Sequence, residues 1–134
     1  TYNFETLRVP VNNSIAEMDM LVLSLVKILI DSLNEKKITS QLTGSYEKLV
    51  GSISKLEAWL VEKNIENCDE HIKFLRNLQE LRSSGTGHRK GKGYQKITKT
   101  LDVKNENYAE TFSNLLNGAT DFIIFMDANS VKLV

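Results

Sequence analysis

The sequence contains very little cysteine and histidine, and this limits the chemistry that the chain can carry. Cys68 is the only cysteine among the 134 residues, so the chain cannot form an internal disulfide, which is typical of proteins in a reducing compartment. Together with two separated histidines, His71 and His88, it does not supply the four ligands of a structural zinc site. We therefore expect neither a metal nor a cofactor.

Long apolar runs and a secretory signal are also absent. The most apolar stretch, Met20–Ile30, is interrupted by Ser24 and Lys27, whereas a membrane-spanning helix needs about 20 apolar residues. No basic segment is followed by an apolar stretch and a small-residue cleavage site. We expect a cytoplasmic protein that does not contact a membrane. Because the chain begins with Thr1 and not with methionine, we also expect residues 1–134 to be a single domain of a larger protein.

The chain has no net charge, yet its charges are unevenly distributed. Residues 82–104 contain seven lysines or arginines and one acid, while the remainder contains ten basic and sixteen acidic residues. Four of the seven glycines also lie between residues 85 and 93. A basic segment on an acidic body is typical of a local anion-binding surface. The alternative is a solvated, mobile loop that its lysines keep soluble.

Apolar residues recur at steps of three and four residues in four stretches of the chain, which is the pattern of helices with one buried face. These stretches predict helices at residues 14–35, 45–63, 69–83 and 107–128. There is no two-residue hairpin signal and no internal repeat. We therefore predict an all-α fold, a four-helix bundle in which a long, basic, glycine-rich loop joins the third helix to the fourth.

Several residues outside the basic segment have simple structural interpretations. Gly51 interrupts the second helical pattern, where glycine costs about 1 kcal/mol relative to alanine. His71, in the first turn of the third predicted helix, is interpreted as an exposed polar residue, and Cys68 as a structural one. Residues 131–134 are predicted to form a tail. None of these residues is assigned a functional role.

The glycines between residues 85 and 93 invite comparison with the phosphate-binding loop of nucleotide-binding proteins. That loop requires a glycine five positions before its Gly-Lys pair, but Thr86 occupies this position relative to Gly91 and Lys92. The segment also follows a predicted helix and not a strand. A P-loop nucleotide fold is therefore not expected, although such glycines can still present backbone N–H groups to a phosphate.

Arg82 and His88 together offer chemistry suited to a phosphate. Arg82 falls at the end of the third predicted helix and His88 in the adjoining glycine-rich segment, with five residues between them. An arginine binds phosphate through two donors, and a histidine with an ordinary pKa of about 6.5 transfers protons near neutral pH. The pair could therefore combine acid–base work with charge stabilisation during an attack at phosphorus.

The segment Leu81–Gly91, which reads LRSSGTGHRKG, resembles the motif region of HEPN superfamily domains found in large bacterial proteins. That motif is an arginine followed, after four to six residues, by a histidine. Ser83 stands where active members usually carry a polar residue such as asparagine, and more glycines lie between the pair than in the common pattern. The resemblance implies a four-helix bundle and a metal-independent ribonuclease, as many members are in toxin–antitoxin, CRISPR and anti-phage systems.

The resemblance also implies roles for individual residues. His88 would act as acid and base during attack of a ribose 2′-hydroxyl on the adjacent phosphorus, while Arg82 would hold the phosphate. A homodimer, or a pairing with a second HEPN-like unit, would place both residues at a subunit boundary. The residues that would bind RNA are the cations Arg89, Lys90, Lys92 and Lys96, with Tyr94 stacking on a base.

Two other classes of function remain open. One is a non-catalytic helical module that binds RNA, a nucleotide or a protein partner within a larger chain. It shares the basic segment but gives His88 no catalytic role. The other is a structural interaction domain with a disordered loop and no affinity for polyanions. Phosphate binding by several cations weakens as salt rises, so salt-sensitive binding of polyanions separates this last class from the others.

Overall fold

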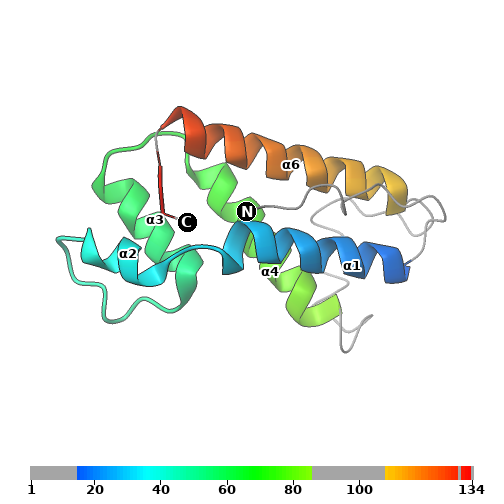
Figure 1. Ribbon diagram of the computed structural model, residues 1–134, viewed down its shortest axis with the longest axis horizontal. Helices are drawn as coiled ribbons and strands as arrows, with labels where there is room; N and C mark the ends of the chain where they lie inside the picture. Colours follow the sequence, from blue (N-terminus) through cyan, green and yellow to red (C-terminus); the bar gives the residue numbers. More distant parts are fainter. Residues whose placement is uncertain (1–14, 86–107, 130, 134) are drawn as a thin grey trace.

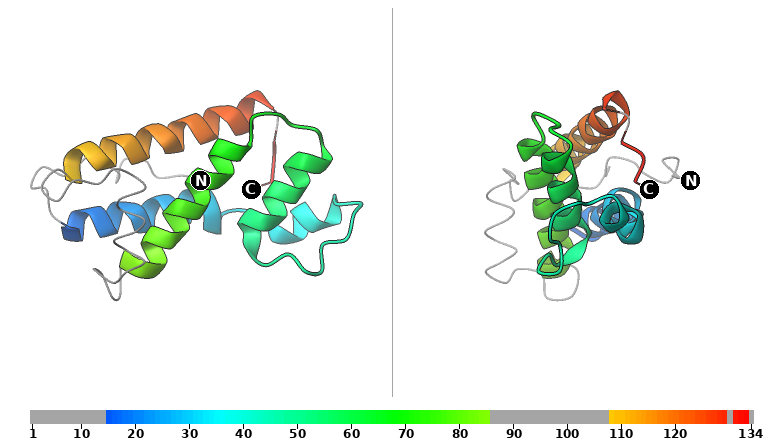
Figure 2. Two further views of the ribbon diagram at one scale, coloured as in Figure 1. Left: turned by 180° about the vertical axis from the view of Figure 1, so that it is seen from behind. Right: turned by 90° about the vertical axis from the view of Figure 1, so that its left-hand side faces the viewer.

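The computed structural model describes residues 15–85, 108–129 and 131–133, and all the regular structure within them is helical. The elements are α1 (Ile15–Val26), the π-helix η2 (Lys27–Asp31), α2 (Glu35–Ser40), α3 (Gly51–Glu62), α4 (Asp69–Gly85) and α6 (Tyr108–Ala128). Helix α1 runs alongside α6, α4 crosses both of them, and α2 packs against α3 at one end of the bundle (Figure 1, Figure 2). Four long helices packed together, with no strand in the described residues, confirm the predicted fold class.

Two of the four predicted helices are confirmed to within two residues at each end, and two are wrong at one end. The third prediction corresponds to α4 and the fourth to α6. The first, 14–35, is wrong at its C-terminal end, because α1 passes into η2 and the chain then leaves the helix before α2. The second, 45–63, is wrong at its start, because α3 begins at Gly51. The predicted basic loop falls on residues 86–107, which lie outside the described residues.

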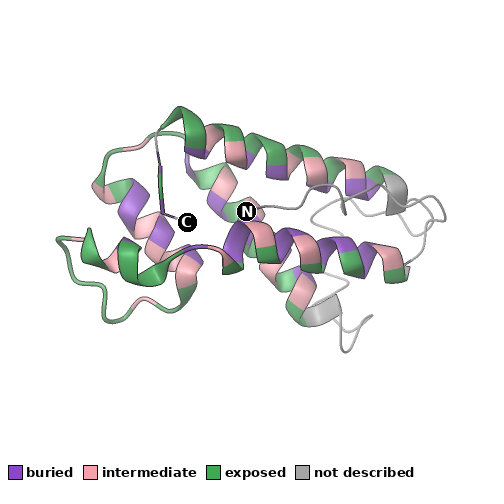
Figure 3. Cartoon of the chain, viewed as in Figure 1, coloured by how far each residue is buried: buried purple, intermediate pink, exposed green. Residues whose placement is uncertain are grey.

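The core lies between the four long helices and consists of the apolar faces that define them in the sequence. Figure 3 shows buried positions recurring along the sides of α1, α4 and α6 that face one another. Side chains with no exposed surface include Leu25, Leu56, Leu75, Leu78 and Phe112. Burying one such side chain contributes about 1.5–3 kcal/mol relative to leaving it in water. Packing between the helices, more than the propensity of each helix, therefore stabilises the bundle.

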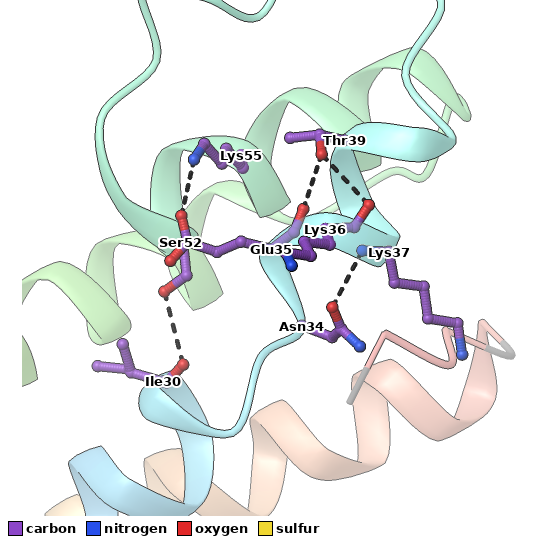
Figure 4. A network of polar contacts seen from close by, with 8 residues as sticks. All are labelled: Ile30, Asn34, Glu35, Lys36, Lys37, Thr39, Ser52 and Lys55. Carbon is purple, nitrogen blue, oxygen red and sulfur yellow. Dashed lines mark hydrogen bonds and ion pairs between the residues drawn. The ribbon is translucent and has the colours of Figure 1, made fainter.

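The break between η2 and α2 has a local cause at Asn34. Its side chain accepts a hydrogen bond from the backbone N–H of Lys37 at 3.0 Å, which caps the N-terminus of α2 (Figure 4). Its own backbone N–H donates to the carbonyl of Leu133 at 2.8 Å. An ion pair between Glu35 and Lys55, with a 2.7 Å separation, then links α2 to α3 (Figure 4). These contacts stabilise a new helix start where the apolar pattern alone predicts a continuous helix.

Within residues 131–133, two side chains are packed in the core, so the prediction of a tail is wrong for the residues that the structure describes there. Val131 and Leu133 are both buried among the core residues. The backbone N–H of Val131 donates to the carbonyl of Met126 at 2.8 Å, which turns the chain back after α6. These two apolar residues are two positions apart, a spacing that differs from the three- and four-residue steps of a buried helical face, so the helical pattern does not predict their burial.

Replacing Gly51 by alanine is expected to lower the free energy of unfolding by about 1 kcal/mol or more. Gly51 is the first residue of α3 and has φ of +85°, a left-handed conformation in which a Cβ is strained. It is therefore not the unfavourable interior helix residue that the sequence indicates. Gly44→Ala is the matched control, because Gly44 has no positive φ and a Cβ there meets nothing within 4 Å. Urea unfolding of both variants measures the difference, and a Gly51→Ala protein as stable as wild type would contradict the assignment.

Candidate functional site

Of the residues that the sequence predicts to act on RNA, only Arg82 lies within the described residues. The others fall in the part of the chain that the structure does not describe, and their roles stay predictions. They are the proposed acid–base residue His88 and the proposed RNA-binding residues Arg89, Lys90, Lys92, Tyr94 and Lys96. The geometry of the candidate site is therefore that of Arg82 and its surroundings.

Arg82 is positioned by the last turns of α4. Leu75, Leu78 and Leu81 recur at three-residue steps and are all buried, which fixes one face of α4 against α1 and η2. Arg82 follows Leu81 directly, so its side chain leaves the helix beside the buried stripe, and 29% of that side chain is exposed. The helix dipole also favours a cation in the last turn. Packing of its neighbours therefore holds the backbone of Arg82 while its guanidinium reaches the surface.

Arg82 forms an ion pair with Asp31, the last residue of η2. Its Nη1 group donates to Asp31 Oδ2 at 2.9 Å and to Oδ1 at 3.2 Å. Its Nη2 group donates to Oε1 of Gln79, one turn earlier on α4, at 2.9 Å. One guanidinium nitrogen thus serves both carboxylate oxygens, unlike the two-nitrogen fork of the strongest arginine–carboxylate pairs. Because both side chains are partly exposed, such a pair contributes only about 0–1 kcal/mol to stability.

An open groove of about 380 Å³ lies beside this ion pair, and we call it the α1–α4 groove. Its lining residues come from α1, η2 and α4 and are Met20, Leu23, Ser24, Lys27, Asp31 and Arg82. Met20 is 68% exposed and Leu23 43% exposed, so one wall of the groove is apolar and open to solvent. Lys27 is exposed and makes no ion pair with any other described residue. The groove therefore combines two cations, one carboxylate and an apolar wall.

The remaining histidine and the cysteine are built into the packing of the bundle. The ring of His71 stacks on that of Phe125 in α6, with centroids 4.3 Å apart and planes inclined by 27°. The interpretation of His71 as an exposed polar residue is therefore wrong, since it is half-buried against α6. Cys68 is buried, and burial, with a smaller contribution from the charge of Asp69, raises the pKa of its thiol. The nucleophilic thiolate is thereby disfavoured, which fits the structural role assigned to Cys68.

The described residues contain neither a metal-binding cluster nor a membrane-spanning helix. No group of three or more histidine, cysteine, aspartate or glutamate side chains is arranged there to hold a metal ion. Within the same part of the chain, no helix is both long enough and apolar enough to cross a membrane.

Compared with protein-family models, with curated proteins and with solved structures, the chain matches none of them. Any assignment of function therefore depends on the residues themselves.

Proposed function

We propose that this chain is a metal-independent endoribonuclease of the HEPN type that acts in a toxin or anti-phage defence system. The observation that supports the proposal is the position of Arg82. Its backbone is held by the buried end of α4, and its guanidinium lies at an open groove large enough for a small ligand. An anchor for a phosphate requires this combination, because a fixed cation stabilises developing charge without first having to be reorganised.

The proposed reaction needs one proton acceptor and one source of positive charge. His88 takes the proton of a ribose 2′-hydroxyl as that oxygen attacks the adjacent phosphorus, and it returns a proton to the departing 5′-oxygen. Arg82 stabilises the negative charge that accumulates on the phosphoryl oxygens. The P–O5′ bond breaks as the P–O2′ bond forms, so the products carry a 2′,3′-cyclic phosphate and a 5′-hydroxyl. No metal takes part in this sequence.

The proposal includes a homodimer, or a pairing with a second HEPN-like unit of a larger protein. One arginine and one histidine make a sparse active site, and a second copy of the motif would supply further charge and proton-transfer groups to the same RNA. RNA is the proposed substrate, and Arg89, Lys90, Lys92 and Lys96 are the residues proposed to hold its backbone. Tyr94 is proposed to stack on a base.

Arg82→Lys is expected to keep part of the RNA affinity but to lose cleavage by about 10²-fold. Lysine preserves the charge but replaces a planar, two-pronged donor by a point charge, so it cannot bind two phosphoryl oxygens in the same geometry. Arg76→Lys is the matched control, because Arg76 is also a partly exposed arginine of α4 and pairs with a carboxylate, that of Glu57, at 3.0 Å. Initial rates on a fluorescent single-stranded RNA in EDTA compare the two, and equal rates for Arg82→Lys and wild type would contradict the role of Arg82.

A non-catalytic module that binds RNA, a nucleotide or a protein partner is the second candidate. It is favoured by the contact of Arg82 with Asp31, because this contact gives the arginine a structural role in joining α4 to η2. This candidate predicts salt-sensitive binding of RNA without any cleavage. Incubation of bound RNA with the protein for hours, followed by analysis of its length, distinguishes the two functions.

A further inference from the structure

Lys27 and Arg82 come from distant parts of the sequence and line the same groove. Lys27 begins η2, Asp31 ends it, and Arg82 approaches Asp31 from α4. The groove thus has one more positive than negative charge, and Lys27 has no carboxylate partner among the described residues. A group with a single negative charge, such as a phosphodiester, complements this arrangement.

The contact between Asp31 and Arg82 has a geometry in which a phosphate can replace the carboxylate of Asp31. Asp31 is bound through one guanidinium nitrogen, and its side chain is 46% exposed. A phosphodiester presents two oxygens that can accept from two guanidinium nitrogens at once, which is the stronger arrangement. Water screens the existing pair, so the carboxylate can be replaced by a phosphate at small cost.

The apolar wall of the groove indicates what accompanies the phosphate. Met20 lies on α1 two turns before Lys27 and Leu23 one turn before it, and both are exposed, although leucine and methionine are commonly buried. A base of single-stranded RNA offers an unstacked apolar face close to its own phosphate, whereas free phosphate offers none. The volume of about 380 Å³ is within the range of sites for small ligands.

We propose that the α1–α4 groove is a binding subsite for one nucleotide of single-stranded RNA. Lys27 and Arg82 hold its phosphodiester, and Met20 and Leu23 contact its base. Asp31 is the counter-ion that the phosphate displaces from Arg82. Met20 and Leu23 make the site selective for a nucleotide over free phosphate, because phosphate alone lacks the apolar contact. The inference rests on the proposed function, since it names a part of the same substrate-binding surface.

The test measures binding of a fluorescent 2′-O-methyl single-stranded RNA by anisotropy, because this probe cannot be cleaved by 2′-hydroxyl attack. Asp31→Asn is expected to bind about threefold to tenfold more tightly, since it removes a competing charge while the amide oxygen can still accept from Arg82. Lys27→Gln is expected to bind more weakly by a similar factor and to reduce the salt dependence by about one counterion. Glu57→Gln, which removes the partner of Arg76, is the matched control and is expected to bind as wild type.

Three results would overturn the subsite. The first is unchanged or weaker binding by Asp31→Asn together with unchanged binding by Lys27→Gln. The second is displacement of the RNA by millimolar inorganic phosphate, which would mean a simple anion site. The third is a change in mass on sedimentation, without a change in RNA binding, for Met20→Ser, which would mean that a second copy occupies the groove. If Asp31→Asn binds RNA more tightly but the wild-type protein never cleaves RNA, the result would support the subsite and contradict only the proposed ribonuclease activity.

Discussion

Replacing Leu78 by alanine is expected to lower the free energy of unfolding by about 2–5 kcal/mol. Leu78 has no exposed surface and lies on the buried face of α4, so truncation loses apolar contacts and leaves a cavity among helices that cannot fully close it. Domains of this size are stable by only about 5–15 kcal/mol, so a large share of the total would be lost. Urea unfolding followed by circular dichroism measures the change.

An exposed apolar residue provides the control for this substitution. Val61 on α3 is 62% exposed, and Val61→Ala is expected to change the free energy of unfolding by no more than about 0.5 kcal/mol. The two variants differ mainly in the burial of the side chain that is shortened. Equal stability of the Leu78→Ala and Val61→Ala proteins would show that α4 does not pack in the core as described.

Replacing His88 by alanine is expected to abolish RNA cleavage, with a loss of at least about 10²-fold, while binding and folding stay close to wild type. In the proposed reaction no other histidine of the motif can accept the proton of the 2′-hydroxyl. His71→Ala is the matched control, because His71 stacks on Phe125 and is expected to affect packing and not cleavage. Rates in EDTA and melting temperatures of both variants separate the two effects, and a His88→Ala protein that cleaves as fast as wild type would leave only the binding-module interpretation.

The helices are predictable from the sequence because burial is periodic. Leucines at three- and four-residue steps in α4, for example Leu75 and Leu78, can be buried together only on a helix, and both are buried. The end of the first predicted helix and the start of the second are wrong, because both depend on local contacts and backbone conformation and not on the spacing of apolar residues. Asn34 begins a new helix through a side-chain cap that is completed by contact with Leu133, and Gly51 begins α3 with a left-handed backbone.

The candidate site is less predictable because it is assembled by tertiary contacts. Arg82 is identified by its spacing from His88, which is visible in the sequence. Gln79 could also have been identified, since it lies three residues before Arg82 on the same helix and neighbouring side chains at that spacing meet. Nothing in the sequence pairs Asp31 with Arg82, because the crossing of α4 over η2 brings them together. Lys27 is likewise not identified by the sequence, because only the packing of α4 against α1 and η2 places it in the same groove as Arg82.

Asp31 also lies in an unusual local structure. It ends the π-helix η2, and π-helical turns are rare and occur often at functional sites. Widening the helix by one residue per hydrogen-bonded turn changes the direction in which the following side chains point. The regular helix predicted through residue 35 therefore does not contain the π-helical turn that positions Asp31.

The most direct test of the proposed ribonuclease is the fate of two oligonucleotides in EDTA, one of single-stranded RNA and one of the same sequence with 2′-O-methyl groups. The wild-type protein is expected to cleave only the unmodified strand and to leave 2′,3′-cyclic phosphate ends, and His88→Ala is expected to cleave neither strand. Mass spectrometry of the products identifies the ends. Cleavage of the 2′-O-methyl strand, or an intact RNA strand after incubation with the wild-type protein at concentrations that bind it fully, would contradict the proposed ribonuclease.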